Sequence, residues 1–220
     1  MTATLPSQTP VRPPAKRKSG AGFLAWLAFA GVVSLVVTLV TVSTYVSLDM
    51  SQSRPAMRGP VHYALLIGHI ATGFVALLAG FAQFVPQLRN RHPVLHRWVG
   101  RGYMACVFSS SAFGVVVANL SLAGLSAAAP LTLLAVMWFS TALCGLNAAR
   151  QRDFRAHRVW LIRNFALTTA AVTARLWAAL FFSTVADGGE EIVAAANWLG
   201  FVVNAIVAEW WLQRRVLTVR

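Results

Sequence analysis

Long apolar stretches, separated by short clusters of charged residues, organise the whole chain. A helix needs roughly 20 residues to cross a hydrocarbon core about 30 Å thick, and six apolar stretches reach that length. They run over residues 22–46, 61–86, 98–119, 128–149, 159–183 and 192–213. The pattern predicts an all-α integral membrane protein, a bundle of six transmembrane helices.

Composition supports this class and argues against the soluble ones. Hydrophobic residues make up 57% of the chain and charged residues 11%, whereas about a quarter of the residues of an ordinary soluble domain are charged. The net charge of +13 would favour a nucleic-acid partner if it covered a soluble face. Because the basic residues fall between apolar stretches instead, we predict the lipid bilayer as the partner and no nucleic acid.

The distribution of basic residues predicts the orientation in the membrane. If the N-terminus lies inside, 16 of the 19 Lys and Arg residues fall on the inner side, and the outer loops keep Arg54 and Arg58. Basic loops stay on the cytoplasmic side, so both termini are predicted to be cytoplasmic. Residues 1–19 are predicted to form a disordered basic tail, 20–58 the first transmembrane helix with its outer loop, and 59–215 a five-helix membrane core.

One basic and aromatic phrase occurs twice, each time where a span re-enters the membrane from the inner side. The shared letters are His-Arg and then Trp-x-x-Arg-x-aromatic, with one residue inserted in the second copy. They are His96, Arg97, Trp98, Arg101 and Tyr103, and then His157, Arg158, Trp160, Arg163 and Phe165. The repetition predicts two helical hairpins of the same orientation, residues 61–119 and 128–183, related as parallel repeats.

Small residues recur at every fourth position of several spans. In spans five and six they are Ala166, Ala170, Ala174 and Ala178, and then Ala196, Gly200, Asn204 and Ala208. Faces of this kind let helices approach closely in lipid. They predict a compact six-helix bundle.

Polar residues share single faces of three spans with small residues, by the 3.6-residue period of the helix. The stripe of span two holds His62, His69, Gly73, Ala76, Gly80 and Gln83, that of span three holds His96, Gly100, Tyr103, Ser110 and Gly114, and that of span five holds His157, Leu161, Asn164, Thr168, Ala171 and Arg175. Polar groups inside a membrane face other helices or a water-filled cavity rather than lipid. These faces are therefore predicted to point into the bundle.

Matching depth predicts which polar groups meet. His69 and Arg175 each lie about 12 Å below the outer end of their span, so they are predicted partners, in a structural network or in a functional centre. Glu209 lies near the inner end of span six, at the depth of Arg101 and Arg163. A carboxylate there most simply neutralises an arginine, since a lone charge in hydrocarbon costs several kcal/mol.

The chemistry of these residues leaves several interpretations open. The sequence carries no HExxH, GxSxG, Walker loop or carboxylate pair, so it predicts no particular enzyme activity. A haem b held by two histidines needs imidazoles from different helices at one depth, and the pair that matches is His96 with His157. The arginines available for the haem propionates are Arg97, Arg101, Arg158 and Arg163. The same residues could instead anchor the inner interface or bind an anionic lipid head group on the cytoplasmic side.

The combination of motifs resembles a known family. The motifs are GHIATGFVALLAGFAQF in span two, HPVLHRWVGRGY before span three, DFRAHRVWLIRNFALTTAAVTARLW through span five and VAEW in span six. Together, over roughly residues 60–213, they resemble the bacterial predicted membrane proteins of domain-of-unknown-function family two-three-zero-six. The resemblance implies a multi-pass protein of the bacterial inner membrane, and it implies no activity.

The sequence thus predicts a multi-pass inner-membrane protein with a buried His/Arg polar centre of unknown ligand. A haem- or quinone-linked redox protein and a small-solute or proton carrier are the alternatives. The candidate ligand or cofactor residues are His69, Arg175, His96, His157, Arg97, Arg101, Arg158, Arg163, Tyr103, Gln83 and Glu209.

Overall fold

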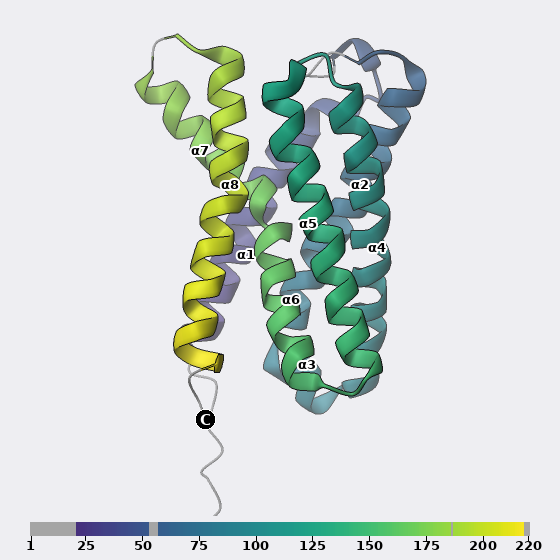
Figure 1. Cartoon of the computed structure of the whole chain (residues 1–220), viewed down its shortest axis with the longest axis vertical. Coiled ribbons are helices and arrows are strands. Elements are labelled where there is room, and N and C mark those ends of the chain that lie inside the picture. Colours follow the sequence, from purple (N-terminus) through teal and green to yellow (C-terminus); the bar gives the residue numbers. More distant parts are fainter. Residues whose placement is uncertain (1–20, 53–56, 186, 218–220) are drawn as a thin grey trace, which may run out of the picture.

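A computed structural model describes residues 21–52, 57–185 and 187–217, and over these ranges the chain is helical, with no strand (Figure 1). Within them, six helical segments are long and apolar enough to cross a membrane. They are Ala21–Tyr45, Pro60–Gln83, Pro93–Leu120, Gly124–Arg150, Phe154–Thr184 and Gly189–Arg215. The predicted all-α class and the six spans are confirmed, while the tail predicted over residues 1–19 lies outside the described residues.

Most spans are single helices. These are α1 (Ala21–Val42), α2 (Pro60–Gln83), α4 (Pro93–Leu120), α5 (Gly124–Arg150) and α8 (Gly189–Leu212). The fifth span is divided into α6 (Phe154–Thr168) and α7 (Ala170–Thr184), and a short α3 (Pro86–Arg91) fills the loop between α2 and α4. Turns of 3-10 helix cover Ser43–Tyr45 and Met50–Gln52, and a π-helical turn covers Gln213–Leu217.

Local chemistry explains where several helices begin. Pro60, Pro86 and Pro93 occupy the first turns of α2, α3 and α4, where the missing N–H costs nothing and the fixed φ suits a helix. Asp153 caps α6, because its carboxylate accepts a 2.9 Å hydrogen bond from the backbone N–H of Ala156. The repeated phrase therefore lies inside the first turns of α4 and α6, and α4 begins several residues before the predicted span.

Four helices, α2, α4, α5 and α6, form the centre of the molecule. α4 packs against α2 and α5, and α6 packs against α5 and, to a smaller extent, α2. Side chains from α4, α5 and α6 fill the core, with Phe201 of α8 closing one side; the largest are Tyr103, Val107, Trp138, Leu167 and Phe201. α4 and α6 thus face each other across the bundle, and the residues between them occupy its axis.

The outer half of the fifth span leaves this bundle. The helix breaks at Thr169, and α7 then packs mainly against α8 and leans away from α5 (Figure 1). Asn204 of α8 stabilises the break, since its amide donates to the carbonyl of Ala166 at 3.0 Å and to the hydroxyl of Thr169 at 3.1 Å. The structure is therefore less compact than predicted, because a polar helix–helix contact holds α7 to α8 instead of α5.

The α7–α8 contact uses the predicted small residues. A Cβ added to Gly200 would lie 2.8 Å from the carbonyl oxygen of Ala170 and 2.8 Å from the Cβ of Ala174. Thr173 reinforces the crossing, as its hydroxyl donates to the Gly200 carbonyl at 2.9 Å. The two backbones approach so closely here that only glycine fits.

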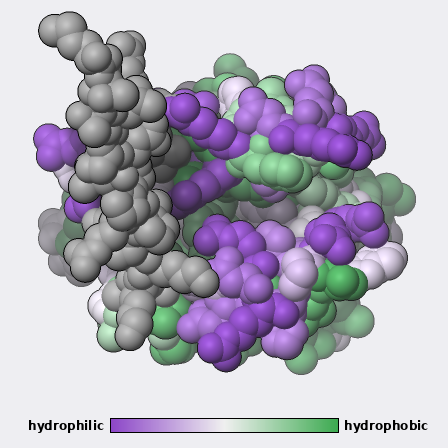
Figure 2. Space-filling model, turned by 90° about the horizontal axis from the view of Figure 1, so that it is seen from below, coloured by the Kyte–Doolittle hydropathy of each residue, from purple (hydrophilic) through white to green (hydrophobic). Residues whose placement is uncertain are grey.

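The two ends of the molecule differ in charge. We call the end formed by α3, the first turns of α4 and α6, the α5–α6 turn and the last turn of α8 the basic end; it lies at the bottom of Figure 1. Seen from this side, hydrophilic side chains gather around a recess hollowed into the bundle (Figure 2). The candidate histidines His96 and His157 belong to this end.

Candidate functional site

A buried hydrogen-bond network, which we call the polar core, joins α4, α5 and α6 near the bundle axis. The hydroxyl of Tyr103 donates to Oδ1 of Asn164 at 2.5 Å and lies 2.8 Å from Oγ1 of Thr168. Nε1 of Trp138 donates to the same Thr168 oxygen at 2.9 Å. Tyr103 and Asn164 are almost completely inaccessible, so these groups depend on one another for their hydrogen bonds.

Each donor of the polar core finds an acceptor. The Asn164 amide donates to the carbonyl of Trp138 at 2.7 Å and to Oγ1 of Thr141 at 2.8 Å. The Thr168 hydroxyl can donate to Tyr103 or to the carbonyl of Asn164. A satisfied buried network stabilises one arrangement of its helices. The polar core therefore fixes the position of α4 against α6.

His96 and His157 lie nearly two helical turns from the polar core, toward the basic end. Each is seven residues before a member of the network, His96 before Tyr103 and His157 before Asn164. Seven residues are nearly two helical turns and a rise of about 10 Å, and α4 and α6 both start at the basic end. The two imidazoles consequently share the faces of Tyr103 and Asn164, and they lie close enough for their charges to interact.

The structure orients the imidazole of His157. Its Nδ1 lies 2.8 Å from the carbonyl oxygen of Gly145, and because a carbonyl only accepts, Nδ1 carries the hydrogen. Nε2 is left with its lone pair, and among the described residues no group donates to it. A histidine that donates from one nitrogen to a backbone carbonyl is oriented as ligating histidines are.

His96 has a different environment. Its Nδ1 is buried without a hydrogen-bond partner among the described groups, and its carbonyl accepts from Nε2 of Gln83 at 3.2 Å. Arg89 and Arg97 are near enough to act on its charge. Gln83 therefore positions the backbone of the first turn of α4, and the ring itself has free hydrogen-bonding capacity.

The arginines of the two repeated phrases have equivalent contacts. Arg101 lies over the ring of Trp98, and Arg163 lies over the ring of Trp160, each at 4.9 Å from the ring centroid. Arg97, Arg101 and Arg158 are exposed at the basic end. The local arrangement of the phrase thus recurs, whereas the relation between the whole hairpins stays a prediction.

Glu209 forms an ion pair with Arg163. Nε and Nη2 of Arg163 donate to the two carboxylate oxygens at 2.9 and 3.0 Å, and the bidentate geometry is the strong form of this contact. This pairing agrees with the interpretation that a carboxylate at this depth neutralises an arginine. It ties α6 to α8 and removes Arg163 from the cations available to a ligand.

His69 and Arg175 do not hydrogen-bond to each other. Nδ1 of His69 lies 2.8 Å from the carbonyl oxygen of Ser110 on α4, and Nη1 of Arg175 donates to the carbonyl of Ala171 at 3.0 Å. The two side chains lie within electrostatic range of one another. The hydrogen-bond partner of His69 is therefore Ser110 rather than Arg175, and a joint centre of His69 and Arg175 stays a prediction.

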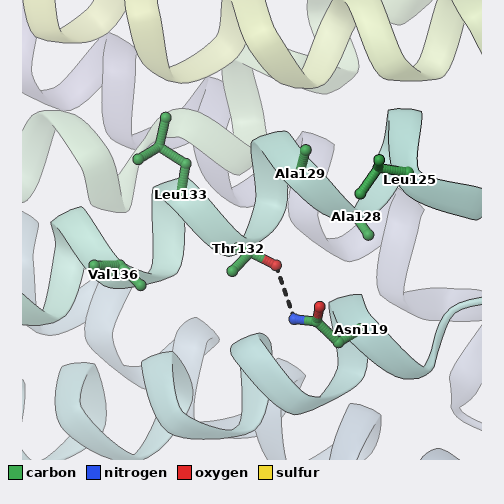
Figure 3. A pocket seen from close by; sticks show the side chains of 7 residues that line it. All are labelled: Asn119, Leu125, Ala128, Ala129, Thr132, Leu133 and Val136. Carbon is green, nitrogen blue, oxygen red and sulfur yellow. Dashed lines mark hydrogen bonds between the residues drawn. The ribbon is translucent and has the colours of Figure 1, made fainter.

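A groove of about 350 Å³ lies elsewhere, between α4 and α5 at the end opposite the basic end (Figure 3). Leu125, Leu133 and Val136 contribute to its lining, and the hydrogen bond from Asn119 to Thr132, 2.9 Å long, crosses it. No residue that lines it carries a titratable or nucleophilic group other than the hydroxyl of Thr132. We therefore place the candidate site between His96 and His157 instead.

Comparison with known protein families supports the resemblance seen in the sequence. The model of the DUF2306 family of predicted membrane proteins matches residues 66–212. The chain belongs to the DUF2306 family. No curated protein and no solved structure matches it. Every candidate residue of this DUF2306 protein, from His69 to Glu209, falls within the matched range.

Two members of the polar core in this DUF2306 protein were not predicted from the sequence. Trp138 and Thr141 of α5 complete the network that Tyr103, Asn164 and Thr168 begin. Their three-residue spacing places them on one face of α5, and this is the signal that could have identified them. Described residues include no group of three or more His, Cys, Asp or Glu that could hold a metal ion.

Proposed function

We propose that this protein binds a b-type haem between His96 and His157 at the basic end and carries electrons in the membrane. The observation that carries the proposal is the placement of these imidazoles on α4 and α6, one heptad below the Tyr103–Asn164 contact. Two histidines from opposite helices would suffice to hold a haem, which would supply one-electron redox chemistry. A protein-bound metal ion without a macrocycle would require more ligands.

Three features of the surroundings support a haem in preference to a simple anchor. Nε2 of His157 has its lone pair available, because Nδ1 is occupied by the Gly145 carbonyl. His96 has an unpartnered ring nitrogen among the described groups. Exposed arginines at the rim, Arg97 and Arg158 among them, can pair with two propionate carboxylates. The polar core would then bound the haem site on the side away from the basic end.

The absorption spectrum of the purified protein tests this proposal. In mild detergent, with haem supplied during expression, we expect a Soret band and a reduced-minus-oxidised difference spectrum typical of a b-type cytochrome. His96→Asn and His157→Asn should each lose most of the bound haem, since each removes one of two axial ligands.

His92→Asn is the matched control, because His92 is an exposed histidine of the basic end that lies just before α4. It should retain the bound haem. Absence of the Soret band in the wild-type protein after haem supplementation would overturn the proposal, as would equal haem content in all three variants.

We also propose that the protein lies in a bacterial inner membrane with the basic end toward the cytoplasm. The excess of arginine at this end supports the orientation. Green fluorescent protein fused to the C-terminus should fluoresce, since it folds in the cytoplasm, and alkaline phosphatase fused there should be inactive. The reverse pair of results would show that the basic end faces outward.

A further inference from the structure

We propose that His69 and Arg175 form a binding site for a membrane quinol, in the half of the bundle away from the basic end. The inference rests on the proposed function, because the quinol would supply the electrons that the haem accepts. It begins from the orientation of His69, which the structure fixes without using all of its hydrogen-bonding capacity.

The ring of His69 is held by α4. Nδ1 lies 2.8 Å from the carbonyl oxygen of Ser110, and the Ser110 hydroxyl donates to the carbonyl of His69 at 3.0 Å. A Cβ at Gly114 would lie 3.1 Å from the ring, so a larger residue there would press on the imidazole. The ring is therefore locked between α2 and α4.

This contact also determines the tautomer. Since the Ser110 carbonyl can only accept, Nδ1 of His69 carries the hydrogen and Nε2 is an acceptor. None of the described residues donates to Nε2. His69 consequently presents a lone pair, and it suits a ligand that has a hydrogen to donate.

Arg175 provides the complementary group. Its side chain is exposed, yet it lies at mid-depth of the fifth span and within electrostatic range of His69. Its guanidinium donates to the Ala171 carbonyl, Tyr45 at the end of the first span interacts with its charge, and no carboxylate of the described ranges forms an ion pair with it. An arginine inside a membrane needs polar partners, and a guanidinium has five N–H donors, more than one carbonyl can accept.

The departure of α7 from the bundle leaves the side chain of Arg175 exposed toward the lipid. α7 packs against α8 and touches α1, while its contacts with α2, α4 and α5 are few or none, and Figure 1 shows it leaning outward. The break at Thr169 and the Gly200 crossing hold this position. A ligand dissolved in the bilayer can therefore approach Arg175 sideways, without passing through water.

A ligand that contacts both residues must suit the acceptor Nε2 of His69 and the cationic donor of Arg175. This requirement favours some lipid-soluble ligands over others. A fatty-acid carboxylate would suit Arg175, but the lone pair on Nε2 of His69 would repel it. A quinol suits both groups, because one hydroxyl can donate to Nε2 while the other oxygen accepts from the guanidinium. We therefore favour a quinol over a carboxylate or a phospholipid head group.

The site lies on the same stripe of α4 as the proposed haem. His96, Tyr103 and Ser110 follow one another on α4 at intervals of seven residues. Ser110, the hydrogen-bond partner of His69, therefore lies about 20 Å along α4 from His96. The polar core lies between the two. This arrangement separates the quinol from the haem by packed protein and leaves no direct contact between them.

The reaction balances as a two-electron, two-proton oxidation. Both quinol O–H bonds break, the first proton goes to Nε2 of His69 and the second to water, and the ring becomes a quinone. The two electrons would leave one at a time through a haem held by His96 and His157, which would supply the one-electron chemistry, and ferricyanide would be the final one-electron acceptor in the assay. His69 returns its proton to water before the next quinol binds.

Reduction of the bound haem by a short-chain quinol tests the inference. In the purified holoprotein, His69→Asn and Arg175→Gln should each slow reduction by decylubiquinol by about 100-fold, the range of general base catalysis. The Asn amide can still donate to the Ser110 carbonyl but offers no Nε2. The dithionite-reduced spectrum should be unchanged in both variants, and Arg58→Gln, an arginine of the same end, should behave as wild type.

The outcomes separate this inference from the proposed function. If the haem is present and decylubiquinol reduces the wild type and both variants equally fast, the quinol site is overturned and the haem proposal stands. If the protein binds no haem, the haem proposal fails, and an azido-quinone photolabel then tests the site directly. Labelling near Arg175 that decylubiquinol displaces and either variant removes supports it; labelling that oleate displaces instead, or that neither variant changes, overturns it.

Discussion

Gly200→Leu is expected to destabilise the protein by about 3 kcal/mol, because the added side chain overpacks the crossing of α7 and α8. Even one added carbon would lie 2.8 Å from the carbonyl oxygen of Ala170 and 2.9 Å from the backbone nitrogen of Ala174. Backbone atoms cannot rotate away as side chains can, so α7 and α8 must separate. The hydrogen bonds from Thr173 and Asn204 across this contact would be lost with it.

Gly102→Leu is the matched control for this prediction. Gly102 is exposed on α4, and a Cβ there would meet no atom within 4 Å. The midpoint of thermal unfolding in mild detergent should fall for Gly200→Leu and change little for Gly102→Leu. Equal midpoints for the two variants would show that the close α7–α8 contact is wrong.

Asn164→Leu is expected to cost about 3 kcal/mol, because it removes three hydrogen bonds of the buried polar core. The hydroxyl of Tyr103 loses the acceptor of its 2.5 Å hydrogen bond, and the carbonyl of Trp138 and the hydroxyl of Thr141 lose the Asn164 amide. Leucine has a similar volume, so packing changes little and the loss reports mainly on hydrogen bonding.

A double substitution separates the hydrogen bonds from the packing. Adding Tyr103→Phe to Asn164→Leu removes no further Tyr103–Asn164 hydrogen bond, since that bond is already lost, so the pair should be less destabilised than the two single effects together, by about 1 kcal/mol. Asn119→Leu, at an exposed asparagine of α4, should cost less than about 1 kcal/mol in the same unfolding assay. Strict additivity for Tyr103 and Asn164 would contradict a shared polar core.

The six spans could be predicted from the sequence because the thickness of the bilayer sets the length of an apolar helix. The division of the fifth span at Thr169 could not, because it depends on contacts with Asn204 and Gly200, which come from a helix far along the chain. The stripes of small residues predicted close helix packing without identifying the partners, and the structure uses two of them where α7 crosses α8. They did not indicate that α7 would leave α5 for this crossing.

The candidate site could be predicted in part. Helical periodicity placed His96 with Tyr103, and His157 with Asn164, on inward-facing stripes, and the structure joins Tyr103 to Asn164 between α4 and α6. The helical period shows which residues share a face of one helix, but it does not show toward which neighbouring helix that face is turned. For that reason it could not show that Ser110, rather than Arg175, is the hydrogen-bond partner of His69.

The spin state of the oxidised iron tests the central claim, that His96 and His157 together hold a haem, most directly. Two axial imidazoles make ferric haem low-spin, and loss of one ligand makes it high-spin. Electron paramagnetic resonance of the purified wild-type protein and of His92→Asn should show a low-spin ferric haem, and any haem retained by His96→Asn or His157→Asn should be high-spin. A wild-type protein that binds no haem, or one whose low-spin signal persists in both of the latter variants, would contradict the account.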